Sequence, residues 1–305
     1  MKILVIFTGG TIGSRKNEGV ISPDTKTKYT LIENYKKAFG DDIEFSFLEP
    51  YFLLSENLSA DILNTLISTV CENLEGGFDG IIVTHGTDTL QYSAAALSFA
   101  VGSDSLPIVM VSANYPLENP LSNGDANFAA AVDFIKSASG RGVFIAYKNR
   151  GETLKFHAPF SCLTFGEADD SLYSIKGNFY AEYKEGEIQK NEKFEGKNIE
   201  ARGAFTLKAR PQILVTPAHP ADSFNYPVED YKAVILCPYH SGTLNTENPD
   251  FVAFLKRAKR ATVPVFSVNY PSGDIYETAT VFEKLGITPL SETFIYSFMK
   301  IWLEL

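Results

Sequence analysis

The chain has 305 residues, more than one small hydrophobic core usually supports, so two domains are expected. Apolar residues make up 45% and charged residues 21%, an ordinary globular composition, and no stretch of about 20 apolar residues predicts a membrane span. The formal net charge of −10 argues against nucleic acids and anionic membranes as partners, because both attract clustered Lys and Arg, and it favours a small-molecule ligand.

The first segment, MKILVIFTGG, is interpreted as a buried strand that runs into a glycine-rich turn. It has neither a long apolar region nor a small-residue cleavage site, so a signal peptide is not predicted. Continuous apolar runs, as opposed to alternating ones, are typical of strands buried on both faces of a parallel sheet. Such runs occupy residues 3–7, 81–84, 108–111 and 143–146.

Segments with helical periodicity separate these runs. The clearest follows Ser59, a favourable N-cap, carries an apolar stripe on one face and ends at Gly76–Gly77. A second follows Asp88 and a third follows Gly124. The alternation of strands and helices predicts an α/β domain, doubly wound around a mostly parallel sheet.

The second half of the chain repeats this alternation after a polar stretch. Residues 178–211 are rich in charged side chains and indicate hairpins and a linker. Beyond Pro211 we expect strands at 213–216, 233–237 and 263–268 and helices near 249–260, 276–285 and 291–304. The predicted division is a larger N-terminal domain (1–190), a linker (191–210) and a smaller C-terminal α/β domain (211–305).

Cysteine and histidine spacing supports neither a disulfide framework nor a metal site. The three cysteines are scattered and form no CxxC pair, and His157, His219 and His240 lack metal-ligand spacing. Free thiols suit the reducing cytoplasm, which is the location we predict. His85 ends a predicted strand, and we interpret it as a packed side chain fixed by a hydrogen bond, not as a general base.

Two glycine–threonine turns follow the first two buried runs. The first reads TGGTIG from Thr8 to Gly13, and the second reads HGTDT from His85 to Thr89. Glycine lets the backbone approach a ligand closely, and ligands of open α/β sheets bind beyond the carboxyl ends of the strands. The first turn lacks the GxGxxG and GxxxxGK[ST] patterns of nucleotide sites.

A threonine that acts as a nucleophile needs a proton acceptor beside it. A threonine hydroxyl is a poor nucleophile unless a neighbouring base accepts its proton. Asp88 adjoins Thr87, but a carboxylate alone is a weak base for an alcohol. A lysine whose pKa is lowered by burial could accept the proton, and the residues alone leave open which lysine that is.

The motifs TGGTIG and HGTDT, in this order and at strand ends, resemble the bacterial-type asparaginases, particularly their cytoplasmic type I branch. The resemblance extends through DGIIVTHGTDTLQYSAAALSF and PIVMVSANYPLENPLSNG and more weakly over most of the chain. It implies an L-asparagine amidohydrolase with a larger and a smaller α/β domain. It further implies an acyl-enzyme on a threonine, no metal or organic cofactor, and a homodimer that is often doubled to a homotetramer.

The resemblance also assigns roles to individual residues. It implies that Thr11 is the nucleophile on the N-terminal loop and that Thr87, Asp88 and Lys155 form a second, buried set. Asp88 is also implied as the partner of the substrate's α-ammonium group.

Further positions are implied in substrate binding. Ser55, in LSENL, corresponds to the serine that binds the α-carboxylate, and backbone N–H groups at the glycine turns, including Gly86, would hold the oxyanion. Asn245, in SGTLN, corresponds to a residue that reaches a neighbouring subunit's site.

The sequence departs from the family pattern at two places. In the family, a tyrosine on the N-terminal loop contacts the nucleophile; its position falls near Val20 in this chain, and Tyr29 is the candidate substitute. The family's Asp-Gly before the third helix is Asn123-Gly124 here. Two alternatives therefore stand beside the asparaginase. One is a glutamine-directed or tRNA-linked amidase, against which the acidic charge argues, and the other is a catalytically weakened asparagine-binding protein.

Overall fold

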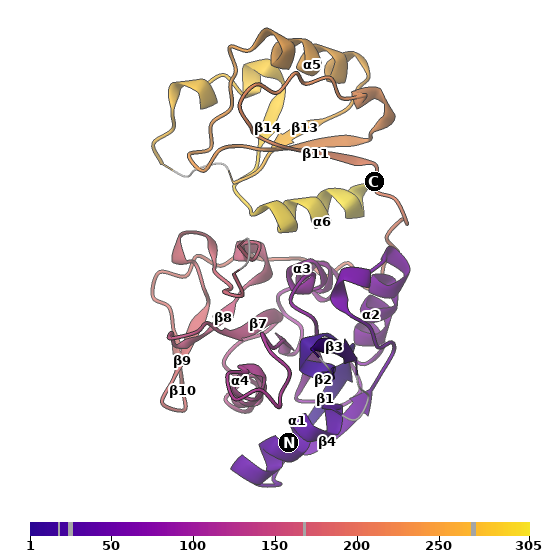
Figure 1. Ribbon diagram of the computed structural model, residues 1–305, viewed down its shortest axis with the longest axis vertical. Coiled ribbons are helices and arrows are strands. Elements are labelled where there is room, and N and C mark those ends of the chain that lie inside the picture. The colour runs from indigo at the N-terminus through magenta and orange to yellow at the C-terminus, as the bar shows by residue number, and fades with distance from the viewer. Residues whose placement is uncertain (18, 24–26, 167–168, 270–272) are drawn as a thin grey trace. The chain divides into compact units, whose positions relative to one another are not determined.

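The chain folds into two compact units, Met1–Thr206 and Leu207–Leu305 (Figure 1). The structure is a computed structural model that describes residues 1–17, 19–23, 27–166, 169–269 and 273–305. Part of the expected linker belongs to the first unit, where it runs beside the end of a helix. There Ser103 N donates to Ile199 O at 2.9 Å, and Arg202 N donates to Phe99 O at 3.0 Å.

The first unit is built on an eight-stranded, mostly parallel sheet, which confirms the predicted fold class. Its parallel part contains β4 (Glu44–Leu48), β1 (Lys2–Phe7), β5 (Gly80–Thr84), β6 (Ile108–Val111) and β7 (Val143–Lys148), in this spatial order. Its antiparallel part contains β8 (Leu154–His157), β9 (Ala181–Lys184) and β10 (Glu187–Lys190). The sequence analysis did not predict β4 and β8, because EFSFL and LKFH alternate and contain no continuous apolar run.

Helices cover both faces of this sheet. α1 (Thr27–Phe39) and α4 (Gly124–Lys136) pack together, and their apolar side chains share one core with β1 and β7. α2 (Ala60–Glu72) and α3 (Leu90–Val101) pack together on the other face (Figure 1). The N-cap prediction is confirmed, since the Ser59 side chain accepts a hydrogen bond from Ile62 N at 3.3 Å.

The strand order reverses between β1 and β5. The chain leaves β1 towards one side to form β4 and then crosses to the other side to form β5. The two following loops therefore diverge at the carboxyl ends of β1 and β5. Such a reversal is where open α/β sheets bind ligands. The two glycine–threonine turns begin at these two strand ends.

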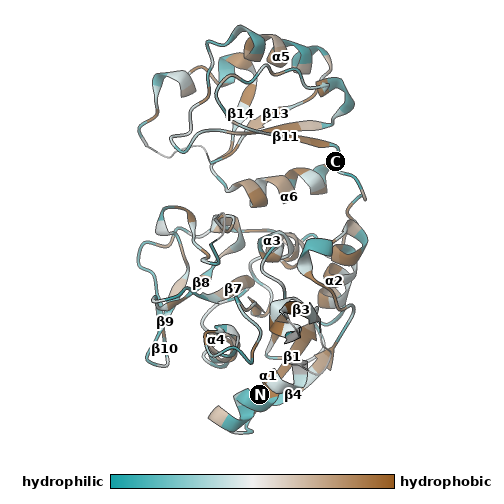
Figure 2. Cartoon of the chain, in the orientation of Figure 1, coloured by the Kyte–Doolittle hydropathy of each residue, from teal (hydrophilic) through white to brown (hydrophobic). Residues whose placement is uncertain are grey.

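The second unit contains a smaller, fully parallel sheet. Its strands are β11 (Ile213–Pro217), β12 (Ala233–Cys237), β13 (Val265–Ser267) and β14 (Ile287–Pro289), in this order. α5 (Pro249–Arg260) and α6 (Phe294–Glu304) cover opposite faces of this sheet. Alternate residues of β12 show this, since Val234 and Leu236 share a core with α5 while Ala233 and Ile235 share one with α6. Figure 2 shows the brown apolar strands of this sheet beneath the largely teal α5.

One predicted helix of the second unit is wrong. Residues 276–285 form two short 3-10 turns, Glu277–Ala279 and Glu283–Leu285, in place of a continuous helix. The segment ETATVFEKLG contains three β-branched side chains, which favour helix less than straight-chain residues do. Gly286 then adopts a left-handed conformation and leads into β14.

Candidate active site

The first turn is held against two neighbouring segments. Thr8 Oγ1 donates to Thr84 O at 2.6 Å, which ties the end of β1 to the end of β5. Gly10 N donates to Leu53 O at 2.9 Å. Gly9 and Gly10 have φ values of 101° and 73°, which side chains rarely adopt, so this path requires glycine.

The two turns meet through their glycine backbones. A Cβ atom at Gly10 would lie 2.3 Å from Gly86 N, and a Cβ atom at Gly86 would lie 2.3 Å from Ser55 Oγ. These distances are too short for any side chain at either glycine. Gly10, Gly86 and the buried Ser55 are therefore in direct contact, and Thr11 and Thr87 are the residues that follow the two glycines in the chain.

Each threonine is positioned by a short local framework. Thr11 is partly buried and opens the 3-10 turn Thr11–Gly13, which Ser14 steadies because its Oγ donates to Gly10 O at 2.7 Å. Thr87 is also partly buried and precedes α3. Thr89 Oγ1 donates to Ser55 O at 2.9 Å and so fastens the second turn to the Ser55 segment.

A carboxyl pair stands beside the threonines. Asp88 is exposed, and its side chain lies near that of Glu56, the residue after Ser55. Burial, and then the charge and hydrogen bond of Glu56, raise the pKa of Asp88. Sequence reasoning missed Glu56; its position next to Ser55 was the available signal. Two adjacent carboxyls form a site that favours a cationic group.

His85 supports the second turn from beneath. Its Nδ1 lies 2.9 Å from Gly86 O and its Nε2 lies 2.8 Å from Ser93 Oγ. Burial lowers the pKa of His85 to about 4, so the ring is neutral near pH 7, donates from Nδ1 and accepts from Ser93. The ring has two partners where one was expected from the sequence: Nδ1 holds Gly86, and Nε2 holds the ring to Ser93 of α3.

The structure does not bring Lys155 to Asp88. Lys155 lies on β8, which is separated from β5 by β7 and β6, about 14 Å at the usual strand spacing. Its Nζ forms an ion pair with Glu152 Oε2 at 2.8 Å and lies 5.3 Å from the centre of the Phe179 ring. The pKa of Asp88 is raised by burial and Glu56, and no lysine contributes to the shift.

The remaining predicted residues lie on other elements. Asn245 is exposed in the second unit, after β12, and lines an open groove that includes Tyr239 and Tyr276. Val20 is 65% exposed near the turn of a small hairpin, and Tyr29 is 56% exposed in the first turn of α1. Asn123 precedes α4, where its side chain accepts from Asn114 N at 2.9 Å.

A phenol that the sequence analysis did not consider lies close to the first turn. The Tyr51 hydroxyl is buried near the side chain of Thr8 and has no hydrogen-bond partner among the described residues; burial raises its pKa above the ordinary tyrosine value. The segment that carries it continues to Leu53, the partner of Gly10. The structure therefore brings one aromatic hydroxyl to the base of the Thr11 turn.

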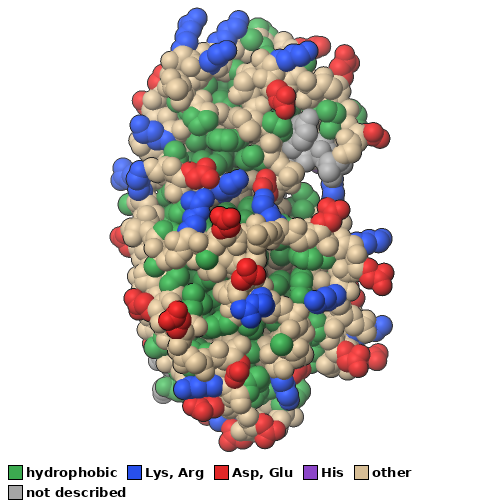
Figure 3. Space-filling model, turned by 180° about the vertical axis from the view of Figure 1, so that it is seen from behind, with side chains coloured by type: hydrophobic (Ala, Val, Ile, Leu, Met, Phe, Trp, Pro, Cys, Tyr) green, Lys and Arg blue, Asp and Glu red, His purple; other side chains and the backbone are tan. Residues whose placement is uncertain are grey.

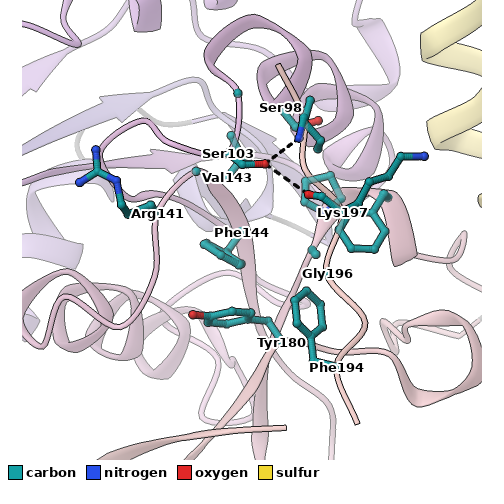
Figure 4. A pocket seen from close by; sticks show the side chains of 15 residues that line it. Ser98, Ser103, Arg141, Val143, Phe144, Tyr180, Phe194, Gly196 and Lys197 are labelled. Carbon is teal, nitrogen blue, oxygen red and sulfur yellow. Dashed lines mark hydrogen bonds between the residues drawn. The ribbon is translucent and has the colours of Figure 1, made fainter. Parts of the chain in front are cut away.

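A second hollow of about 140 Å³ opens at the opposite edge of the main sheet, where β7 begins and α3 ends. Phe144, Tyr180 and Phe194 turn their rings towards it (Figure 4). Aromatic, small and basic residues line it together, and the side chains of Ser98 and Ser103 donate hydrogen bonds to backbone carbonyls. It lacks the two threonine turns and the carboxyl pair found at the reversal between β1 and β5, so that reversal remains the candidate active site.

Metal-ligating side chains are dispersed over the described ranges. Among these residues no group of three or more His, Cys, Asp or Glu side chains is arranged to hold a metal ion. No helix within the same ranges is both long and apolar enough to pass through a bilayer. Figure 3 shows basic and acidic side chains interspersed on one face of the molecule.

Sequence comparisons connect this site to known proteins. Residues 2–190 match the family described as Asparaginase, N-terminal. The chain is 30% identical over 285 residues to a subunit of the glutamyl-tRNA(Gln) amidotransferase of Methanosarcina mazei, covering 87% of this chain and 63% of that protein. It is 30% identical over 151 residues to the L-asparaginase of Thermococcus kodakarensis, covering 49% and 45%. The chain thus spans 63% of the M. mazei protein and 31% of its Methanosarcina acetivorans counterpart.

Solved structures share the fold. The thermostable L-asparaginase of T. kodakarensis superposes with a TM-score of 0.80 at 22% identity, covering 99% of this chain and 92% of that one. L-asparaginase I of Vibrio cholerae gives 0.80 at 19% identity with the same coverage. The family match spans well over half of the chain and includes both threonine turns, so the chain belongs to the asparaginase family, whose members are amidohydrolases.

Proposed function

We propose that the protein hydrolyses the side-chain amide of free L-asparagine to give aspartate and ammonia. The observation that carries this proposal is the meeting of the two glycine–threonine turns at the reversal between β1 and β5. Each of the touching glycines is followed by a threonine, so the proposed site has two hydroxyls, of Thr11 and Thr87, next to a glycine backbone. The adjoining carboxyls supply a place for an ammonium group.

The substrate is proposed to bind through both ends of its amino acid moiety. Asp88 and Glu56 attract the α-ammonium group, because they are adjacent carboxyls beside the second glycine–threonine turn. Ser55, buried against Gly86, receives the α-carboxylate. The side-chain amide then extends towards Thr11 and Thr87.

The proposed reaction passes through an acyl-enzyme. The Thr11 hydroxyl attacks the amide carbon, and backbone N–H groups at the glycine turns stabilise the developing oxyanion. The C–N bond breaks, the nitrogen takes a proton and leaves as ammonia, and water then hydrolyses the threonine ester to release aspartate. Thr87, next to Asp88, is proposed to assist the proton transfers.

The proton acceptor for these steps is proposed to be Lys155, as the family resemblance implies. His85 is a poor candidate because its two nitrogens already have partners. Lys155 pairs with Glu152 in this structure, so it must exchange that partner, or act through intervening groups, to serve Thr87. Free Cys71, Cys162 and Cys237 support the proposed cytoplasmic location.

A second candidate function is favoured by one specific observation. The alignment to the M. mazei amidotransferase protein covers 87% of this chain. On this reading the same threonine site would release ammonia from an amide for a tRNA-dependent amidotransferase. Ammonia release by the purified chain from L-asparagine, well above that from L-glutamine and without tRNA, supports the asparaginase; the reverse preference supports the amidotransferase.

Removal of either threonine hydroxyl should abolish most of the activity. We expect Thr11→Ala and Thr87→Ala each to lower kcat by roughly a thousandfold or more, because each hydroxyl acts in the transition state. Ammonia release from L-asparagine, measured with a chelator present, tests this. Thr69→Ala, on the outer part of α2, is the matched control and should be unchanged. Normal kcat in Thr87→Ala would limit that residue to a structural role, and binding without turnover in the wild type would identify an asparagine-binding protein.

The acidic pair predicts a specific pH dependence of substrate affinity. The ammonium group binds the ionised form of Asp88, whose pKa is raised, so KM should fall as the pH rises through that pKa. Glu56→Gln removes a neighbouring negative charge, which lowers the pKa of Asp88 and should move the KM profile to lower pH. The plateau KM should rise, because one carboxylate is lost. Glu75→Gln is the control, and an unmoved profile in Glu56→Gln would contradict the pairing.

Subunit mixing tests the proposed homo-oligomer. If Asn245 completes a neighbouring subunit's site, a heterodimer of Thr11→Ala and Asn245→Ala chains contains one intact site and one doubly altered site. Random mixing of two inactive dimers should then restore about a quarter of wild-type activity. Sedimentation should show the active species as a dimer or tetramer. An active monomer, or no recovery on mixing, would exclude a shared site.

The replacement for the family's loop tyrosine can be tested by deleting single hydroxyls. If Tyr29 contacts the nucleophile when substrate is bound, Tyr29→Phe should lower kcat about tenfold, which corresponds to about 1.4 kcal/mol of transition-state stabilisation. Tyr51→Phe removes the phenol that lies against Thr8 and is the competing variant. A loss confined to Tyr51→Phe would transfer the role to Tyr51, and unchanged kcat in both would leave the nucleophile without a phenol.

A further inference from the structure

The segment that carries Thr11 continues directly into a separate hairpin. β2 (Ser14–Asn17) and β3 (Val20–Pro23) pair with each other and with no other strand of the described chain. β2 starts where the 3-10 turn Thr11–Gly13 ends. Because only Ile12 and Gly13 separate Thr11 from this hairpin, a movement of the hairpin is expected to move Thr11 as well.

The hairpin side of the Thr11 turn makes two contacts with the loop between β6 and α4. Arg15 Nε on β2 lies 2.9 Å from Glu118 Oε1, an ion pair whose side chains are each a little under half exposed. Beneath it, Ile12 and Leu117 meet at Gly124: a Cβ atom at Gly124 would lie 2.6 Å from Leu117 Cδ2 and 3.4 Å from Ile12 Cγ1. An apolar contact and an ion pair thus join the same two segments.

The loop that provides Glu118 is internally braced. Asn119 N donates to Pro116 O at 2.9 Å, and Ser122 Oγ donates to Tyr115 O at 2.8 Å. Asn114 and Asn123 exchange hydrogen bonds between their backbone N–H groups and side chains, at 2.9 and 3.1 Å. These hydrogen bonds fix the loop that carries Glu118. Its carboxylate can therefore hold Arg15, and with it the β2–β3 hairpin, in place.

We propose that Arg15 and Glu118 are positioning residues whose ion pair holds the β2–β3 hairpin in the placement that presents the Thr11 hydroxyl to the substrate amide. This inference rests on the proposed function. An exposed ion pair contributes little to the stability of a whole domain. A hairpin outside the main sheet, however, changes position at small free-energy cost, so a pair of this strength is enough to shift the placement.

Charge reversal with rescue tests the pair. Arg15→Glu and Glu118→Arg should each lower kcat for asparagine about two- to fivefold, the range that an exposed pair supports, with a smaller change in KM. The double variant Arg15→Glu/Glu118→Arg restores opposite charges and should recover most of the loss. Hydrogen–deuterium exchange of the hairpin amides should accelerate in both single variants and return in the double variant.

The control is another exposed ion pair of the first unit, Lys36–Asp41, whose Nζ and Oδ1 lie 2.6 Å apart near the end of α1. Lys36→Glu changes the net charge as Arg15→Glu does and should alter neither kcat nor hairpin exchange. Unchanged exchange and kcat in the single variants, or a double variant that is no better than they are, would overturn the proposal. If the wild type releases no ammonia but the hydrogen–deuterium exchange of the hairpin amides changes as expected, the proposed function is rejected. The role of the ion pair in holding the hairpin would still be supported.

Discussion

The direct backbone contact between Gly10 and Gly86 is the constraint on which the whole candidate site depends. Neighbouring parallel strands lie about 4.8 Å apart, so two turns that leave β1 and β5 touch only when neither carries a side chain at the point of contact. Because both positions are glycine, the two turns come into direct contact immediately before Thr11 and Thr87. Ser55 closes the third side through its contact with Gly86.

The electrostatics of the site favour a cationic group, such as the ammonium group of the proposed substrate. Burial, and then repulsion from the neighbouring Glu56, raise the pKa of Asp88 in the free protein. A bound ammonium group relieves that repulsion and so gains affinity from it. His85 is kept neutral by burial and adds no positive charge near the ammonium position. Perturbed carboxyls of this kind concentrate at functional sites.

The two halves of the site differ in how firmly they are held. The Thr87 turn lies between β5, which is buried throughout, and α3, which is almost entirely buried. The Thr11 turn lies between the buried β1 and a two-stranded hairpin outside the main sheet. One hydroxyl is therefore set by the core of the domain, while the other is set by local contacts such as those to the loop before α4. An enzyme that must admit substrate and then exclude water is served by this asymmetry.

The sequence by itself determined the strands with continuous apolar runs (β1, β5, β6 and β7), the helix that follows Ser59 and the two glycine–threonine turns, because each of these depends on short-range patterns of apolar residues, caps and glycines. Tertiary structure decided the rest. β8 pairs with β7, which places Lys155 beside Glu152 and away from Asp88, and no local pattern encodes that strand order. The Glu56–Asp88 and Arg15–Glu118 pairs each join segments that are distant in the chain. Such contacts depend on the path of the intervening chain, so the spacing of residues along the sequence cannot determine them.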